Sequence, residues 1–147
     1  MEEPLTLESS ERDFAARYAS HAAHGLIYPQ PEGSPLLEFV AGGRVLYLFD
    51  RSGPYSAQPG KARVVVHGVL EADSVELLAG TEHREVLSVQ GVSALAGCGQ
   101  ITHTVGKAWV VQARLPLVLA AFGELPQVTP GQWITFRTLA PLHGFVV

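Results

Sequence analysis

The stretch "PLLEFVAGGRVLYLFD", residues 35–50, decides the fold of this chain. Two apolar runs lie on either side of a Gly-Gly pair, and glycine supplies the positive φ angles that tight hairpin turns need. Pairing Ala41 with Arg44 across this turn places Phe39 opposite Leu46 on one face of the two strands. The stretch therefore predicts an antiparallel hairpin with one apolar face turned toward a core.

Short apolar runs separated by turn signals continue through the rest of the chain. Gly106 and Lys107 form another two-residue turn signal, while residues 117–125 are compatible with strand or helix. This spacing predicts an all-β fold of about nine short strands, an antiparallel, partly closed barrel or sandwich. No internal sequence repeat is visible. The further predicted strands lie in residues 63–80, 84–91, 100–105, 108–115, 132–139 and 143–147.

One helix is predicted near the N-terminus. Ser10 followed by Asp13 fits a capped helix start, and Gly25 stands where a left-handed C-terminal residue is expected. Between them, Phe14 and Tyr18 belong to an apolar stripe at helical spacing. We therefore expect this helix to pack on the β-rich core.

Length and composition indicate one packed domain. The chain has 147 residues, of which 47% are hydrophobic and 16% charged, enough to bury one core. A single cysteine excludes a disulfide framework, no run approaches the roughly 18 apolar residues of a membrane span, and the acidic start is unlike a targeting leader. We expect a cytoplasmic protein without a membrane partner. The domain 1–147 divides into an acidic segment and helix (1–27), a proline-rich turn (28–35) and a β-rich core (36–147).

The formal net charge of −4 argues against strong binding to nucleic acid, which requires several phosphates to be neutralised. This charge is unevenly distributed along the chain. From residue 86 onward, Lys107, Arg114 and Arg137 stand against Glu124 alone, a balance of +2. Nucleic acid therefore stays a possible partner because of the mildly basic C-terminal region, although the net charge disfavours it.

The only cysteine, Cys98, lies five positions before His103. In a regular strand successive side chains alternate between faces, so this spacing places the two groups on opposite sides and prevents a thiol–imidazole pair. A bulge, which Gly97 and Gly99 permit, is the way in which a strand could bring them to one face. We therefore interpret Cys98 as a buried core residue.

His21 and His24 stand three apart on the predicted helix, a spacing that can present two ligands to a metal. Two ligands do not complete a site, and the helix dipole and the apolar stripe account for both residues. The sequence also lacks metalloprotease, nucleophile-elbow and glycine-rich phosphate-loop motifs. No catalytic residue, metal site or cofactor is therefore predicted, and an enzymatic role is disfavoured.

Candidate binding residues come from the stretch "QWITFRT", residues 132–138. If Ile134 and Phe136 face the core, the alternate side chains face solvent, where an aromatic ring can stack on a base and a guanidinium can hold a phosphate. In the alternative, the aromatic ring packs under the helix and the guanidinium pairs with a helix carboxylate. The candidate ligand or nucleic-acid-binding residues are Trp133, Thr135, Arg137, Arg114 and Lys107.

The stretch "GSPLLEFVAGGRVLYLF", residues 33–49, is faintly similar to the early strands of flavin-binding split barrels of the pyridoxamine-phosphate-oxidase type. That resemblance implies a flavin-type cofactor site on a split barrel. The lysine and asparagine with which those proteins contact the flavin phosphate have no counterpart in residues 50–60. The resemblance therefore does not establish membership of that family.

Two stretches, residues 62–70 and 107–122, are apolar on both faces of the strands that they predict. Such strands must be covered on both sides, by the helix, by a second sheet or by another copy of the chain. The sequence therefore predicts a non-enzymatic β-barrel module for binding or assembly that self-associates into a homo-oligomer. Two alternatives stay open: a barrel like the oligonucleotide-binding fold that binds single-stranded nucleic acid weakly, and a flavin-binding split barrel.

Overall fold

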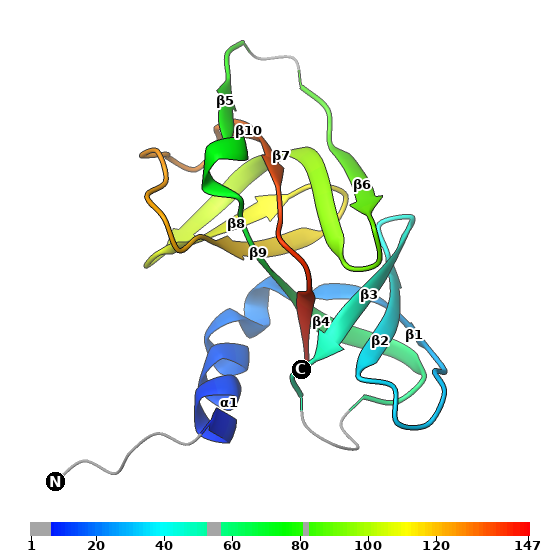
Figure 1. The fold of residues 1–147 in the computed structure, drawn as a ribbon. Coiled ribbons are helices and arrows are strands. Elements are labelled where there is room, and N and C mark those ends of the chain that lie inside the picture. Colours follow the sequence, from blue (N-terminus) through cyan, green and yellow to red (C-terminus); the bar gives the residue numbers. More distant parts are fainter. Residues whose placement is uncertain (1–6, 53–56, 81–82) are drawn as a thin grey trace, which may run out of the picture.

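The computed structural model describes residues 7–52, 57–80 and 83–147. The described chain is mostly β, with a single α-helix at its N-terminal end, as the sequence predicts (Figure 1). The elements are α1 (Leu7–Tyr18), the 3-10 helix η1 (Ala19–His21), β1 (Ala23–Tyr28), β2 (Leu36–Ala41), β3 (Arg44–Asp50), β4 (Gly60–Val69), the 3-10 helix η2 (Ala72–Ser74), β5 (Glu76–Leu78), β6 (Val86–Gln90), β7 (Ala94–Val105), β8 (Ala108–Gln112), β9 (Pro116–Ala120), β10 (Trp133–Arg137) and β11 (Leu142–Val146).

Five strands close a first barrel in the order β1-β2-β3-β11-β4, with β4 paired back to β1. All neighbours in this ring are antiparallel except β3 and β11, which are parallel. The predicted pairs of Ala41 with Arg44 and of Phe39 with Leu46 are present in the β2–β3 hairpin. The barrel prediction is therefore confirmed, and its hairpin register follows from the Gly-Gly turn.

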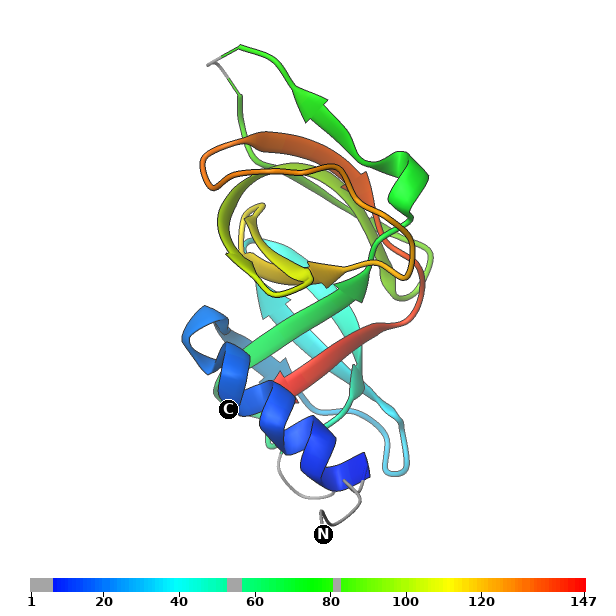
Figure 2. The same ribbon diagram turned by 90° about the vertical axis from the view of Figure 1, so that its left-hand side faces the viewer.

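A second ring of strands lies beyond the first and contains β9, β8, β7, β10 and the far end of β4 (Figure 2). Here β4 runs parallel to β9, and β7 is antiparallel to both β8 and β10. A bridge between Leu70 and Thr138 closes the ring, and the Leu139 backbone N–H donates to the Val69 carbonyl oxygen at 2.7 Å. The strands β5 and β6 flank this second barrel through β10 and β7.

The two barrels follow one strand plan. Each has a three-strand meander (β1-β2-β3 or β7-β8-β9), a fourth strand antiparallel to the first (β4 or β10), and a fifth strand that comes from the other half of the chain. Long strand β4 passes from the first barrel into the second, and the β10–β11 segment passes back. This internal repeat leaves no trace in the sequence because strand pairing uses backbone groups that every residue except proline carries in full.

Two features of the N-terminal region differ from the sequence prediction. Helix α1 ends at Tyr18 and a strand, β1, begins at Ala23, so the β-rich core starts before residue 36. Gly25 lies inside β1 instead of ending the helix, and a Cβ there would collide with the carbonyl oxygen of Val40 on β2. This glycine therefore permits the close approach of two strands, a tertiary requirement that helical spacing cannot reveal.

The helix covers the second apolar face of the central strands. Val64 and Val66 point into the barrel interior, whereas Val65 points outward, yet all three side chains are fully buried. The outward cluster consists of Tyr18 of α1, Ala22 just after η1 and residues of four strands, with Phe14 and Ala15 of α1 packed against it. Strands that are apolar on both faces are therefore covered within one chain. The buried members of this cluster are Tyr18, Ala22, Val65, Ala108, Val110, Val118 and Phe145.

Candidate ligand-binding groove

The binding residues predicted from the sequence do not converge on one site. Trp133, Thr135 and Arg137 lie on the outer side of β10, opposite the buried Ile134 and Phe136, as strand alternation predicts. Lys107 lies in the β7–β8 turn and Arg114 in the β8–β9 turn, which are at opposite ends of β8. A five-residue strand is about 17 Å long, so these two cations cannot share one small ligand.

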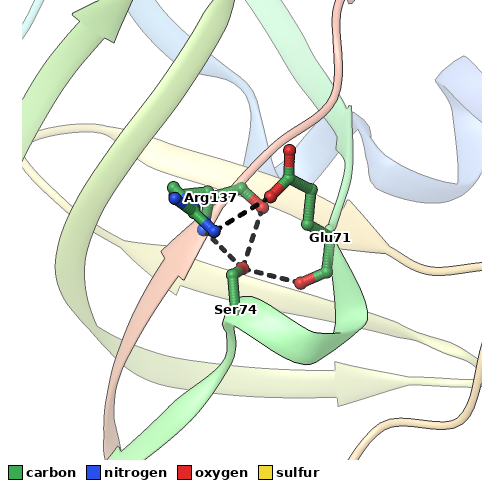
Figure 3. Close-up of polar contacts among 3 residues, drawn as sticks. All are labelled: Glu71, Ser74 and Arg137. Carbon is green, nitrogen blue, oxygen red and sulfur yellow. Dashed lines mark hydrogen bonds and ion pairs between the residues drawn. The ribbon is translucent and has the colours of Figure 1, made fainter.

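Arg137 is held by η2 (Figure 3). Its guanidinium forms an ion pair with Glu71 at 3.3 Å, and its backbone N–H donates to Ser74 Oγ at 2.9 Å. Ser74 Oγ donates in turn to the Glu71 carbonyl oxygen at 2.6 Å. The side chains of Asp73 and Glu76 line the same shallow hollow, so an anion there would meet carboxylates as well as a guanidinium.

The alternative placement of these two residues under the helix is also wrong. Arg137 pairs with Glu71 and not with a helix carboxylate, and the Trp133 ring lies 5.5 Å from the ring of His83. The strand β5 pairs with β10 at this position, so β5, and not α1, lies beside these residues.

Arg114 connects the two barrels. It adopts a φ of 69°, and its guanidinium Nε donates to the Gly42 carbonyl oxygen at 2.6 Å, at the tip of the β2–β3 hairpin. Its backbone N–H donates to the carboxylate of Glu85. These contacts are structural, because they engage Arg114 with protein groups on both sides.

Cys98 lies on the outer side of β7 and is half-buried, so its prediction as a core residue is wrong. The buried side chains of this strand are Leu95 and Ile101, and a register shift between Ile101 and His103 alters the alternation beyond them. Burial raises the pKa of the Cys98 thiol, which makes it a poorer nucleophile at neutral pH. Five residues of strand separate Cys98 from His103 by about 16 Å, too far for a catalytic pair.

The histidines do not form a metal site in the described part of the chain. His24 lies exposed on β1, whereas His21 ends η1 with its ring 4.5 Å from the ring of His103. No three histidine, cysteine, aspartate or glutamate side chains within residues 7–52, 57–80 and 83–147 are grouped closely enough to hold a metal ion. None of the helices in those same ranges is long and apolar enough to cross a membrane.

A groove of about 890 Å³ follows the seam between β1 and β4, on the outside of the first barrel. In the β1–β4 register, His24 lies opposite Arg63 and Leu26 lies opposite Lys61, and all four side chains line the groove. The Arg63 guanidinium also donates to the Ala19 carbonyl oxygen of η1 at 2.9 Å. Two cations and a histidine therefore gather on one strand seam, and this seam defines the cationic groove.

The outer side of β1, β2 and β3 continues from this groove as an exposed apolar and aromatic surface. Leu26, Tyr28 and Val45 are 40%, 44% and 45% exposed, values that are high for large apolar side chains in strands. Their neighbours across the sheet are Val40 and Tyr47. We call this surface the aromatic face, and it consists of Leu26, Tyr28, Val40, Val45 and Tyr47.

A polar cluster lies in the aromatic face. Glu38 stands between Tyr28 and Tyr47 in the β1-β2-β3 register. Its carboxylate accepts a hydrogen bond from the Tyr47 hydroxyl at 3.1 Å and from the Gln30 amide at 3.2 Å. The hydrogen bond and the negative charge of Glu38 raise the pKa of Tyr47, so this phenol stays neutral at physiological pH. The face thus combines two aromatic rings with one engaged carboxylate.

Sequence reasoning missed both surfaces because each depends on strands that are distant in the chain. One signal was available: "GKARVVV", residues 60–66, begins with alternating cations before its apolar run. Alternation places Lys61 and Arg63 on the same side of a strand. Which strand lies beside them, and with which side chains, depends on the pairing of β4 with β1.

The first barrel, which carries both surfaces, is a closed ring of five strands with one parallel pair, β3 with β11. A fold does not by itself imply a function. No protein-family model matches the chain, and neither the curated proteins nor the solved structures contain a match.

Proposed function

We propose that this protein is a non-enzymatic binding module that takes a single-stranded nucleic acid along the cationic groove and the aromatic face. The observation that carries the proposal is the direct contact between the two surfaces, where Lys61 lies opposite Leu26 across the β1–β4 seam. Cations beside exposed aromatic rings are what a single strand requires, because phosphates and bases alternate along it.

The role of each residue follows from its chemistry. Tyr28 and Tyr47 offer rings on which bases stack, and Lys61 and Arg63 neutralise phosphates. With two phosphate contacts, the slope of log Kobs against log salt concentration is about −1.4, at ~0.7 per contact. The net charge of −4 and the Glu38 carboxylate oppose the ligand, so we expect weak binding at physiological salt.

Titration of a short fluorescently labelled oligothymidine at low salt tests this proposal. Lys61→Gln should weaken binding, whereas Lys107→Gln, which removes the same charge from the β7–β8 turn, should not. Glu38→Gln should strengthen binding, because it removes a carboxylate from the aromatic face. An equal loss for Lys61→Gln and Lys107→Gln would show a non-specific charge effect and contradict the proposed site.

Self-association is a second candidate, and a different observation favours it. Phe122, in the loop after β9, is 93% exposed and borders a hollow of about 490 Å³ lined also by Lys107 and Trp109. An almost fully exposed aromatic ring beside a hollow offers apolar area that a contact with a second copy of the chain would bury. Sedimentation velocity over a range of concentrations should show a dimer that Phe122→Ser dissociates. A monomer at every concentration, or a dimer that Phe122→Ser leaves intact, would contradict this candidate.

A further inference from the structure

Helix α1 lies across the outer side of β4 and β11 (Figure 2). It contacts these strands through aromatic rings. The Phe14 ring stacks on Phe145 of β11 at 4.7 Å and lies 4.6 Å from the ring of Tyr18. Beneath them, Val65 of β4 and Val118 of β9 are fully buried. We call the sheet surface under the helix the covered face. Its sheet residues are Val65, Ala108, Val110, Val118 and Phe145.

Two histidines adjoin the covered face side by side. His67 of β4 and His143 of β11 are paired directly across the two strands, and their ring centroids are 5.8 Å apart. Phe14 of α1 meets the His67 ring edge-on at 4.9 Å. The neighbour of His67 on its other side, in β9, is the apolar Val118. An imidazolium at His67 would therefore face an aromatic ring, an aliphatic side chain and a second imidazole.

The charged groups around this pair come from two further elements. Arg51, just after β3, forms an ion pair with Glu11 of α1 at 2.6 Å. The Arg51 charge disfavours a proton on either histidine, and the Glu11 charge favours one on His143. Because Glu11 is already paired with Arg51, a proton on the histidines adds positive charge to a site that contains a guanidinium.

A second histidine pair lies at the other end of the helical segment. The ring of His21, the last residue of η1, is 4.5 Å from the ring of His103 on β7. Burial and the neighbouring His103 lower the pKa of His21. Four of the six histidines in the chain therefore lie where the helical segment meets the strands, in two pairs.

We propose that α1 is a pH-sensitive cover, which is docked at neutral pH and released in mild acid as His67 and His143 gain protons. Release exposes the covered face, a continuous apolar surface that spans strands of both barrels. The covered face and the cationic groove share no residues, although Arg63 of the groove also donates to the Ala19 carbonyl oxygen of η1, which follows α1.

The direction of the effect follows from proton linkage. Burial, His143 and Arg51 lower the pKa of His67 to about 4, and burial and Arg51 also lower the pKa of His143. Release of the helix removes part of this burial, so the pKa of both groups rises toward the ordinary histidine value of about 6.5. The released form therefore binds more protons between these values, and the docked form loses stability as the pH falls from about 6.5 toward about 4.

Hydrogen–deuterium exchange with peptide resolution tests the proposal on the full-length protein. After correction for the intrinsic pH dependence of exchange, protection of α1 should fall by on the order of tenfold or more between pH 7.5 and pH 5, while β2 and β3 stay protected. His67→Gln combined with His143→Gln should keep α1 protected at pH 5. His83→Gln, at a histidine whose ring lies beside Trp133 on the second barrel, is the matched control, and its α1 protection should fall as in the wild type.

Three results would overturn the proposal: α1 protection that is equal at both pH values, an equal loss in the double variant, or loss of β2–β3 protection together with α1. The last result would mean global unfolding and not release of a cover. Should the double variant fail to fold, an NMR titration of the wild-type histidine rings decides the matter. The His67 and His143 midpoints must then coincide with the loss of α1 protection, and any other midpoint contradicts the proposal.

Discussion

The two barrels are built on the same strand plan, but their outer walls differ. The first barrel carries the cationic groove and the aromatic face, whose side chains extend to solvent. In the second barrel, Arg137 is paired with Glu71, and Arg114 is bonded to the tip of the β2–β3 hairpin. The comparison shows that one strand arrangement can give two different outer surfaces. The outward-facing residues of each barrel decide whether its side chains are available to a ligand or are bonded to other parts of the protein.

The covered face is an outer surface to which both barrels contribute. Its residues come from β4 and β11 as well as from β8 and β9, and α1 lies over them. The crossing strands β4 and β10–β11 make each barrel incomplete without the other half of the chain. We therefore expect the two barrels to unfold together, whereas we expect ligand binding to involve the outer surface of the first barrel alone.

The largest expected loss of stability comes from removing a large side chain from the core of either barrel. Phe39→Ala in the first barrel and Phe136→Ala in the second each remove a fully buried ring, which costs about 3–5 kcal/mol of unfolding free energy. Because the crossing strands link the barrels, each variant should shift one common transition. Denaturation should be followed by fluorescence of Trp109 and Trp133 for the second barrel and by NMR signals of Val45 for the first. Separate midpoints would show that the barrels are independent units.

The next effect is the loss of stability in acid. His67 has an ordinary pKa of about 6.5 in the unfolded chain and about 4 in the folded protein, so protons favour unfolding between these values. At pH 4.5 this group alone should lower the unfolding free energy by about 2.5 kcal/mol relative to pH 7.5. Urea denaturation at both pH values measures this difference in unfolding free energy. The His67→Gln variant should lose less stability over this range, and an unchanged pH dependence in that variant would contradict the assignment.

The binding comparison can be sharpened with one aromatic ring from each barrel. Tyr28→Ala should weaken binding of the oligothymidine by about 1–3 kcal/mol, the usual contribution of a stacked base. Trp133→Ala on β10 should leave the affinity unchanged, because that ring lies beside His83 and away from the cationic groove. The fluorescence titration measures both. A loss confined to Trp133→Ala would move the binding surface to the second barrel.

The smallest effect concerns the ion pair of Arg137. Its side chain is 62% exposed, and water screens an exposed pair strongly. Glu71→Gln should therefore change the unfolding free energy by less than about 1 kcal/mol in thermal or urea denaturation. Ser74→Ala should cost more than Glu71→Gln, since Ser74 Oγ bonds backbone groups of both η2 and β10. The reverse order would show that the charge, and not the hydroxyl, holds β10 to η2.

Much of the first barrel could be predicted from local residue patterns. Glycine at positions 42 and 43 has positive φ, and a two-residue turn at these positions is sufficient to predict the register of β2 and β3. Strand alternation also placed Ile134 and Phe136 inside and Trp133 outside. The same rule failed at Cys98. A register shift between Ile101 and His103 adds one residue to β7, so the side chains on the far side of this bulge from the β7–β8 turn lie on the opposite face from the one that regular alternation predicts.

The amino-acid sequence by itself determined the fold class, the hairpin turns and the helix at the N-terminal end, since these depend on residues close together in the chain. Only the tertiary structure decided that β4 and β10–β11 cross between two barrels and that Gly25 belongs to a strand. It also decided that Lys61 adjoins Leu26 and that His67 adjoins His143 under a helix. These pairings join distant segments through backbone hydrogen bonds, which carry no residue-specific signal along the chain.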